Sequence, residues 1–131
     1  MSFKLGVMLE SFQLPWREAI VCAAQIGADG VQIRAVDGEL SVDSITKEGK
    51  RELRSRLADN GLEISALCGD LGKGFGDREN NGVLIEKSKR IIDLAKELGT
   101  DIVTTHIGVI PADKSRERYR IMQEACFELA G

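Results

Sequence analysis

Three glycines divide this chain into repeated units in which a helix is followed by a strand. Gly27, Gly61 and Gly99 each end a stretch with helical spacing of apolar residues, and a strand-like apolar run follows each of them. Glycine suits the left-handed conformation that closes a helix. The alternation of helix and strand predicts an α/β fold with a parallel sheet, whose functional groups gather at the carboxyl ends of the strands.

Four βα units follow one another without a linker. The apolar pattern predicts strands at residues 4–9, 31–36, 62–68 and 102–107. The predicted helices run from Pro15 to about Gly27, from a cap at Asp43 or Ser44, from about Val83, and from near Ser115. We expect the last helix to bury Tyr119, Met122, Cys126 and Leu129. Steps of roughly 30 residues between strands fit right-handed βαβ crossovers, so the predicted order is (βα)₄.

Two architectures accept this order. A flavodoxin-like sheet normally has five strands, and a TIM barrel has eight, of which four units make half. Because the chain stops inside an apolar helical stripe, we expect residues 1–131 to form a single domain that is the amino-terminal half of a TIM (β/α)₈ barrel, as a fragment of a longer protein. Such a half-barrel has two unpaired strand edges, which predicts a homo-oligomer or a missing second half-barrel.

Composition excludes several classes of partner. A net charge of −3 and a pI near 5.3 give no concentrated basic surface for nucleic acid. No apolar run approaches the roughly 18 residues of a membrane span, and the first residues lead directly into a strand. The three cysteines, Cys22, Cys68 and Cys126, are widely spaced and odd in number, which favours reduced thiols and a cytoplasmic location.

Polar side chains follow each predicted strand and are the candidate substrate-binding residues. They are Glu10 after the first strand, Arg34 at the second, Cys68 and Asp70 at the third, and His106 at the fourth. Two carboxylates, a guanidinium and an imidazole suit a hydroxylated or phosphorylated ligand. A lone carboxylate is more often a surface residue, however, and Cys68 has no base assigned to it as a nucleophile would require.

His106 is the sharpest candidate because it is the only histidine and ends an apolar strand. Its imidazole could bind a metal, hydrogen-bond a substrate hydroxyl or shuttle a proton; the alternative is a buried histidine that bonds a nearby carbonyl. Arg34 could clamp a phosphate or carboxylate, or could instead form a salt bridge with Glu10, Asp37 or Glu39.

A glycine-rich segment, residues 69–77, follows the third strand. It does not fit the Walker pattern, since Lys73 precedes glycine in place of Ser or Thr, and it lacks the third glycine of a dinucleotide-binding loop. We interpret it as a mobile lid or substrate loop in which Phe75 packs over a bound ligand.

Four segments in register carry a family resemblance that covers the whole chain. They are Lys4-Leu5-Gly6-Val7, residues 23–33 (AAQIGADGVQI), residues 57–64 (LADNGLEI) and residues 98–108 (LGTDIVTTHIG). Together they resemble the sugar phosphate isomerase/epimerase family of the xylose-isomerase-like TIM-barrel superfamily, which also contains endonuclease IV.

The resemblance implies metal-assisted proton transfer through an enediolate on a ketose or aldose, with Mn²⁺, Co²⁺, Mg²⁺ or Zn²⁺ as cofactor. His106 matches a fourth-strand histidine that contacts substrate in the isomerases and metal in the endonuclease branch. The family's metal ligands and acid/base carboxylates come mostly from strands five to eight, which this chain lacks, so we expect the 131 residues alone to show no isomerase activity.

Two alternatives remain beside a sugar isomerase or epimerase. One is a non-catalytic half-barrel that binds a sugar or serves as an assembly subunit. The other is a relative of abasic-site endonucleases, against which the acidic pI counts.

Overall fold

The computed structural model describes residues 2–131, in which four parallel strands form one sheet. The strands are β1 (Gly6–Met8), β2 (Gly30–Arg34), β3 (Glu63–Cys68) and β4 (Val103–Thr104), and they lie in sequence order. A register shift between Val31 and Gln32 interrupts the pairing of β2 with β3. Within the described chain, β1 and β4 are therefore the two edges of the sheet, and the predicted (βα)₄ order is confirmed.

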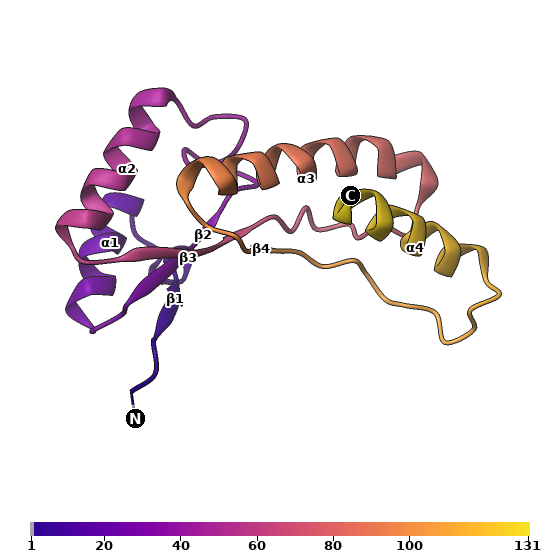
Figure 1. Cartoon of the computed structure of the whole chain (residues 1–131), viewed down its shortest axis with the longest axis horizontal. Helices are drawn as coiled ribbons and strands as arrows, with labels where there is room; N and C mark the ends of the chain where they lie inside the picture. The colour runs from indigo at the N-terminus through magenta and orange to yellow at the C-terminus, as the bar shows by residue number, and fades with distance from the viewer. Residues whose placement is uncertain (1) are drawn as a thin grey trace.

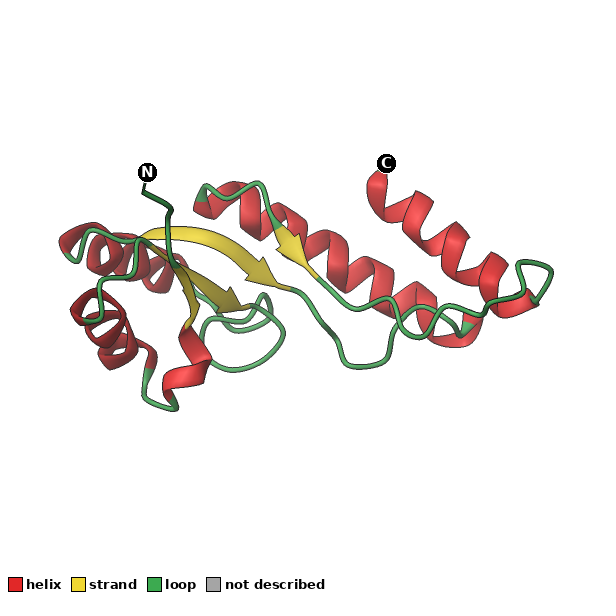
Figure 2. Ribbon diagram, turned by 90° about the horizontal axis from the view of Figure 1, so that it is seen from below, coloured by secondary structure: helices red, strands yellow, loops and turns green. Residues whose placement is uncertain are grey.

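Helices connect successive strands, and one more helix follows the last strand (Figures 1 and 2). They are α1 (Trp16–Gln25), α2 (Lys47–Asp59), α3 (Arg78–Leu98) and α4 (Glu117–Ala130), with a short 3₁₀ helix, η1 (Leu9–Phe12), directly after β1. The molecule is elongated, because α3 and α4 extend together beyond the sheet, away from α1 and α2 (Figure 1). No helix within residues 2–131 has the length and apolar character to cross a membrane.

The three dividing glycines have the predicted conformation. Gly27, Gly61 and Gly99 have φ values of 84°, 66° and 87°, in the left-handed region that glycine adopts without a Cβ clash. Each one reverses the chain after a helix and directs it into the next strand.

Three predicted helix starts differ from the structure. The cap of α2 is Thr46, whose hydroxyl accepts a hydrogen bond from Gly49 N at 2.9 Å, and not Asp43 or Ser44. Helix α3 begins at Arg78, five residues before Val83, because Asp77 caps it by accepting from Glu79 N at 3.0 Å. Helix α4 starts at Glu117, two residues after Ser115.

The main core fills the space between the sheet and helices α1, α2 and the second half of α3. One face of the sheet supplies Val31, Ile33 and Leu67, while Ile20, Leu53 and Ile91 come from the three helices, and all six are almost fully buried. Burying side chains of this size contributes about 1.5–3 kcal/mol each before the entropy cost of ordering the chain. These contacts leave the other face of the sheet uncovered by helices.

A second, smaller core joins the first half of α3 to α4. Its buried members are Phe75, Ile85 and Ala125, and Ile107 and Leu129 pack against them. Helix α4 buries Ile121, Met122 and Ala125; of the four residues predicted to be buried there, Tyr119, Cys126 and Leu129 are only half-buried. Ala125, a small residue, packs with Ile85 of α3.

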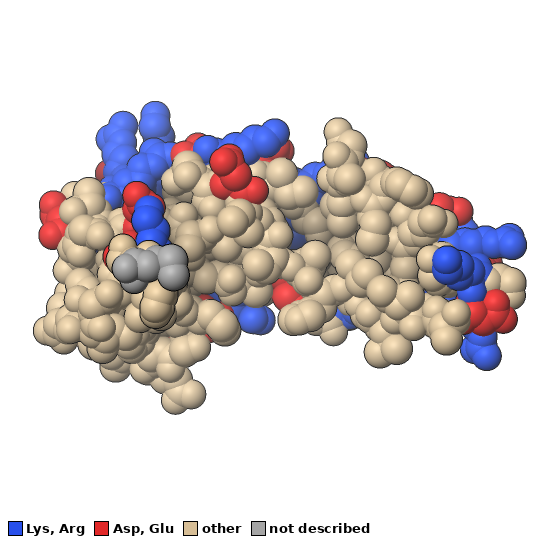
Figure 3. Space-filling view, turned by 60° about the horizontal axis from the view of Figure 1, so that its bottom comes forward, with Lys and Arg blue, Asp and Glu red and all other residues tan. Residues whose placement is uncertain are grey.

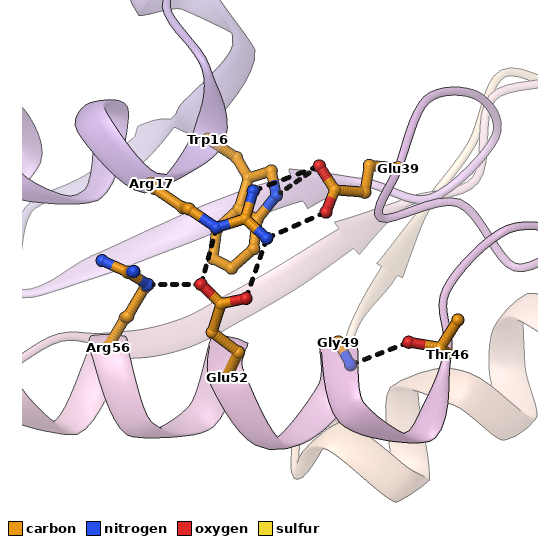
Figure 4. A network of polar contacts seen from close by, with 7 residues as sticks. All are labelled: Trp16, Arg17, Glu39, Thr46, Gly49, Glu52 and Arg56. Atoms are coloured by element: carbon orange, nitrogen blue, oxygen red, sulfur yellow. Dashed lines mark hydrogen bonds and ion pairs between the residues drawn. The ribbon is translucent and has the colours of Figure 1, made fainter.

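A network of ion pairs clamps α1 to α2 (Figure 4). The Arg17 guanidinium lies 4.3 Å from the centre of the Trp16 ring and pairs with Glu39 at 3.0 Å and with Glu52 at 2.6 Å. Arg56 also contacts Glu52, at 2.6 Å. The network connects α1, the β2–α2 loop and α2 at the edge of the main core.

Candidate functional site

The strand register brings the candidate residues together on the uncovered face of the sheet. Arg34 pairs with Cys68, and Cys68 with Thr104, so these three residues form one row across β2, β3 and β4. The preceding row, Ile33, Leu67 and Val103, points to the helices and the main core. Since side chains alternate between faces, the Arg34 row points away from the helices.

Asp70 and His106 extend the same face by one more row. Asp70 is two residues beyond Cys68, and His106 is two residues beyond Thr104. The two segments stay paired there, because Gly69 N donates to Thr104 O at 2.7 Å. As a result, His106 Nδ1 lies 2.6 Å from Asp70 Oδ2. The alternative in which His106 is buried against a carbonyl is wrong, since its side chain is 84% exposed.

Arg34 is the positive centre of this edge. Its Nε donates to Asp37 Oδ1 at 2.8 Å, so the salt-bridge alternative is confirmed for Asp37. The bond to Asp37 raises the pKa of Arg34, to which Cys68 and Glu10 add smaller contributions, and it lowers the pKa of Asp37. The two terminal nitrogens of the guanidinium have no side-chain partner in residues 2–131, which leaves them available to a ligand.

A pocket of about 170 Å³ opens where β1 and β2 end. Its polar lining comes from Glu10, Arg34, Asp37 and Glu39, and its apolar lining from Leu9, Leu14, Trp16, Ile33 and Leu40. The Glu10 Oε2 atom is buried and lacks a hydrogen-bond partner in the described chain. Ligand pockets for small molecules usually enclose about 300–1,000 Å³, so this hollow could cover only part of a ligand.

Trp16 also lines this pocket, although the sequence analysis named no residue of the first helix as a site residue. Its indole Nε1 donates to Glu39 Oε2 at 3.0 Å (Figure 4), and both residues line the pocket. The signal was its place at the start of α1, directly after the loop that leaves the carboxyl end of β1.

The glycine-rich segment does not lie over the site as a lid with Phe75 exposed to ligand. Phe75 is 2% exposed and belongs to the second core, which contradicts that prediction. Phe75 N donates to Ile107 O at 2.9 Å, and Asn81 donates to Phe75 O at 3.0 Å. The segment therefore joins the β3–α3 and β4–α4 connections.

The residues of this chain do not by themselves fit the metal centre that the resemblance implies. Residues 2–131 contain no group of three or more His, Cys, Asp or Glu side chains placed to hold a metal ion. His106 has one acidic neighbour, Asp70, which already bonds its Nδ1 atom. A divalent ion here would need ligands from elsewhere.

Four parallel strands and four helices in alternating order match the amino-terminal half of a TIM barrel. The family model described as xylose isomerase-like TIM barrel matches residues 21–131, and the chain belongs to this family. Both the family resemblance and the half-barrel fold expected from the sequence are thereby confirmed.

Solved structures agree on the fold. A xylose isomerase domain protein from Planctomyces limnophilus matches with a TM-score of 0.71 and 20% identity, over 98% of this chain and 50% of its own. A xylose isomerase-like TIM barrel protein from Mycobacterium smegmatis in complex with magnesium gives 0.61 and 18%, over 98% and 53%.

A sugar phosphate isomerase/epimerase from Parabacteroides distasonis ATCC 8503 gives a TM-score of 0.65 and 15% identity, over 96% of this chain and 46% of its own. The chain thus spans about half the length of these structures. No curated protein matches its sequence significantly.

Proposed function

We propose that this chain supplies the substrate-contacting half of a sugar or sugar phosphate isomerase or epimerase site. The observation that carries the proposal is the convergence of Glu10, Arg34, Asp70 and His106 on one edge of a sheet of the xylose isomerase-like family. Polyhydroxylated ligands need several hydrogen-bonding groups of both kinds, and this edge offers charged donors and acceptors within one face.

Each residue has a distinct role in this proposal. The free nitrogens of Arg34 donate to oxygen atoms of the sugar or its phosphate, and the buried Glu10 oxygen accepts from a hydroxyl. His106 contacts a hydroxyl beside the carbon that loses its proton. Cys68 lies in the same row as Arg34 and contacts the ligand through its thiol, without acting as a nucleophile.

The cofactor in this proposal is a divalent ion, Mn²⁺, Co²⁺, Mg²⁺ or Zn²⁺, held mainly by ligands outside the 131 residues. Magnesium in the Mycobacterium smegmatis protein supports the ion type. When bound, such an ion supplies Lewis-acid polarisation of a sugar carbonyl. The free thiols of Cys22, Cys68 and Cys126 in the described structure support a cytoplasmic location.

The test follows sugar protons in heavy water. The longest natural form of the protein is incubated in D₂O with added Mg²⁺, Mn²⁺ or Co²⁺ and a panel of aldoses, ketoses and their phosphates, and ¹H NMR follows each carbon-bound proton. We expect exchange beside the carbonyl, or at the epimerised carbon, for at least one sugar. Arg34→Ala and His106→Ala should each reduce the rate by about 10²-fold or more, as removal of a positioned polar group does.

Arg78→Ala is the matched control, because Arg78 pairs with Glu124 on α4 and lies outside the candidate site. It should leave exchange unchanged. Sugar binding without exchange of any proton would contradict the enzymatic proposal and favour a non-catalytic sugar-binding protein. Cleavage of abasic DNA without sugar turnover would instead favour the endonuclease branch.

A further inference from the structure

We propose that Asp70 is a positioning residue that holds His106 as its Nδ1–H tautomer and leaves the Nε2 lone pair open to accept a hydrogen bond from a ligand hydroxyl. That the ligand is a sugar rests on the proposed function, whereas the tautomer rests on the geometry of this chain alone.

The Asp70 carboxylate is held from two sides. Its Oδ1 accepts a hydrogen bond from Gly72 N at 2.9 Å, and its Oδ2 lies 2.6 Å from His106 Nδ1. The side chain is 26% exposed, so it has limited freedom to turn away. An ionised carboxylate can only accept, and the proton of this short bond must therefore be on Nδ1. Contact with His106 and, secondarily, with Gly72 N lowers the pKa of Asp70, which keeps it ionised.

The opposite nitrogen of the ring is free. In the part of the chain that the structure describes, His106 makes its side-chain hydrogen bond through Nδ1, and its side chain is 84% exposed. With the proton on Nδ1, Nε2 presents a lone pair. The Arg34 guanidinium, in the adjacent row of strand ends, can only donate hydrogen bonds. The acceptor at His106 Nε2 therefore complements it.

The arrangement also explains why Asp70 and Gly72 stand two residues apart. The bond from Gly72 N to Asp70 Oδ1 closes an Asx turn over residues 70–72, and Gly72 itself has φ of 81°. This turn fixes which carboxylate oxygen faces His106. The start of the glycine-rich segment therefore orients the histidine, while its middle packs into the second core.

The experiment exploits the fact that His106 is the only histidine. A long-range ¹H–¹⁵N correlation spectrum of the ¹⁵N-labelled 131-residue protein, at a pH where the imidazole is neutral, reads which ring nitrogen carries the proton. We expect the Nδ1–H tautomer. A wild-type spectrum of the Nε2–H form would overturn the proposal without any variant being made.

Asp70→Asn gives the sharper test. The amide oxygen of Asn should keep the bond to Gly72 N, which turns its NH₂ group toward His106 Nδ1. Because Nδ1 must then accept, the tautomer should reverse to Nε2–H. Asp37→Asn is the control, since Asp37 lies on the same edge but bonds Arg34, and it should leave the His106 spectrum unchanged. An unchanged spectrum in Asp70→Asn, with an intact backbone amide pattern, would contradict the role of Asp70.

This result and the proposed function can fail separately. The spectra need no substrate, so an absence of sugar exchange would leave the tautomer assignment in place. If exchange is found in the longest natural form, Asp70→Asn should reduce it, and the Asp70→Asn/His106→Ala double variant should lose no more than His106→Ala alone. Additive losses would show that Asp70 does not act through His106.

Discussion

Gly74 lies where the β3–α3 connection contacts the β4–α4 connection. A Cβ atom on Gly74 would lie 2.8 Å from Ile107 O and 2.9 Å from Gly108 Cα, and its φ is 68°. Backbone atoms cannot move aside as a flexible side chain can. A left-handed φ also costs an L-residue about 1–2 kcal/mol. This close approach permits the Phe75 N to Ile107 O bond and thereby the second core.

Gly74→Ala should therefore destabilise the chain by about 2 kcal/mol or more, from the left-handed φ together with the backbone clash. Gly82→Ala is the matched control: Gly82 lies within α3, and an added Cβ there meets no atom within 4 Å. It should stabilise by about 0.5–1 kcal/mol through helix propensity. Urea unfolding measures the free energy of unfolding of both variants. Equal changes for the two alanine substitutions would contradict the close backbone contact at Gly74.

At the scale of elements, Glu52 is the residue on which the α1–α2 clamp depends. Hydrogen bonds from Arg17 and then Arg56 lower its pKa from 4.5 to about 2. The bonds of Arg17 to Glu52 and then to Glu39 raise the pKa of Arg17. Because the folded pKa is depressed, the clamp stabilises the fold fully above pH 4.5. That contribution declines as the pH falls from about 4.5 toward 2.

Glu52→Gln should accordingly lower the Tm near neutral pH and lose this effect in acid. Melting curves of wild type and variant between pH 7 and pH 2 should converge as Glu52 of the wild type becomes protonated. High salt should also narrow the gap at pH 7, since the pair is partly exposed. A constant Tm difference at every pH would mean that Glu52 acts through packing and not through charge.

The sequence predicted the elements better than it predicted their ends. Apolar spacing was sufficient for four strands and four helices, because these elements bury apolar side chains in the main core or, for α4, in the second core. Apolar spacing missed the start of α3, because Asn80, Asn81 and Gly82 are poor helix formers. The Asp77 cap sets the first residue of this helix. Helix propensity alone could not reveal that the buried Asn81 side chain holds this turn by donating to Phe75 O, six residues earlier in the chain.

The candidate site, too, was predictable from the sequence only in part. Its residues were predictable because the ends of parallel strands share one edge. The pairs within it were not, because they depend on register: Cys68 opposite Thr104 is what sets Asp70 beside His106. Phe75 was misplaced because a glycine-rich sequence gives no sign of the second core that fixes it.

At the scale of the whole molecule, the described sheet is open. Strands β1 and β4 are its edges, and large apolar side chains lie exposed beside them, including Leu5, Met8 and Ile102. Figure 3 shows a face on which uncharged residues cover a wide area and charged ones gather mainly toward the ends. Unpaired edges and exposed apolar surface favour association.

The isolated 131-residue chain, with a mass of 14.3 kDa, should therefore form dimers or larger assemblies. Multi-angle light scattering over a range of concentrations measures this directly. Phe127→Glu, on the exposed side of α4, serves as a comparison for Ile102→Glu beside β4, and the β4 change should reduce association more. A monodisperse 14.3-kDa monomer at high concentration would contradict the open-edge account.

A crystal structure of the longest natural form with a bound sugar tests the central claim most directly, namely that these residues are half of a barrel whose strand ends contact substrate. We predict that residues 2–131 form its first four βα units. We also predict that a sugar oxygen lies within hydrogen-bond distance of His106 Nε2 and another near the Arg34 guanidinium. A sugar bound away from this edge, or a sheet whose strand order differs from β1-β2-β3-β4, would contradict the account.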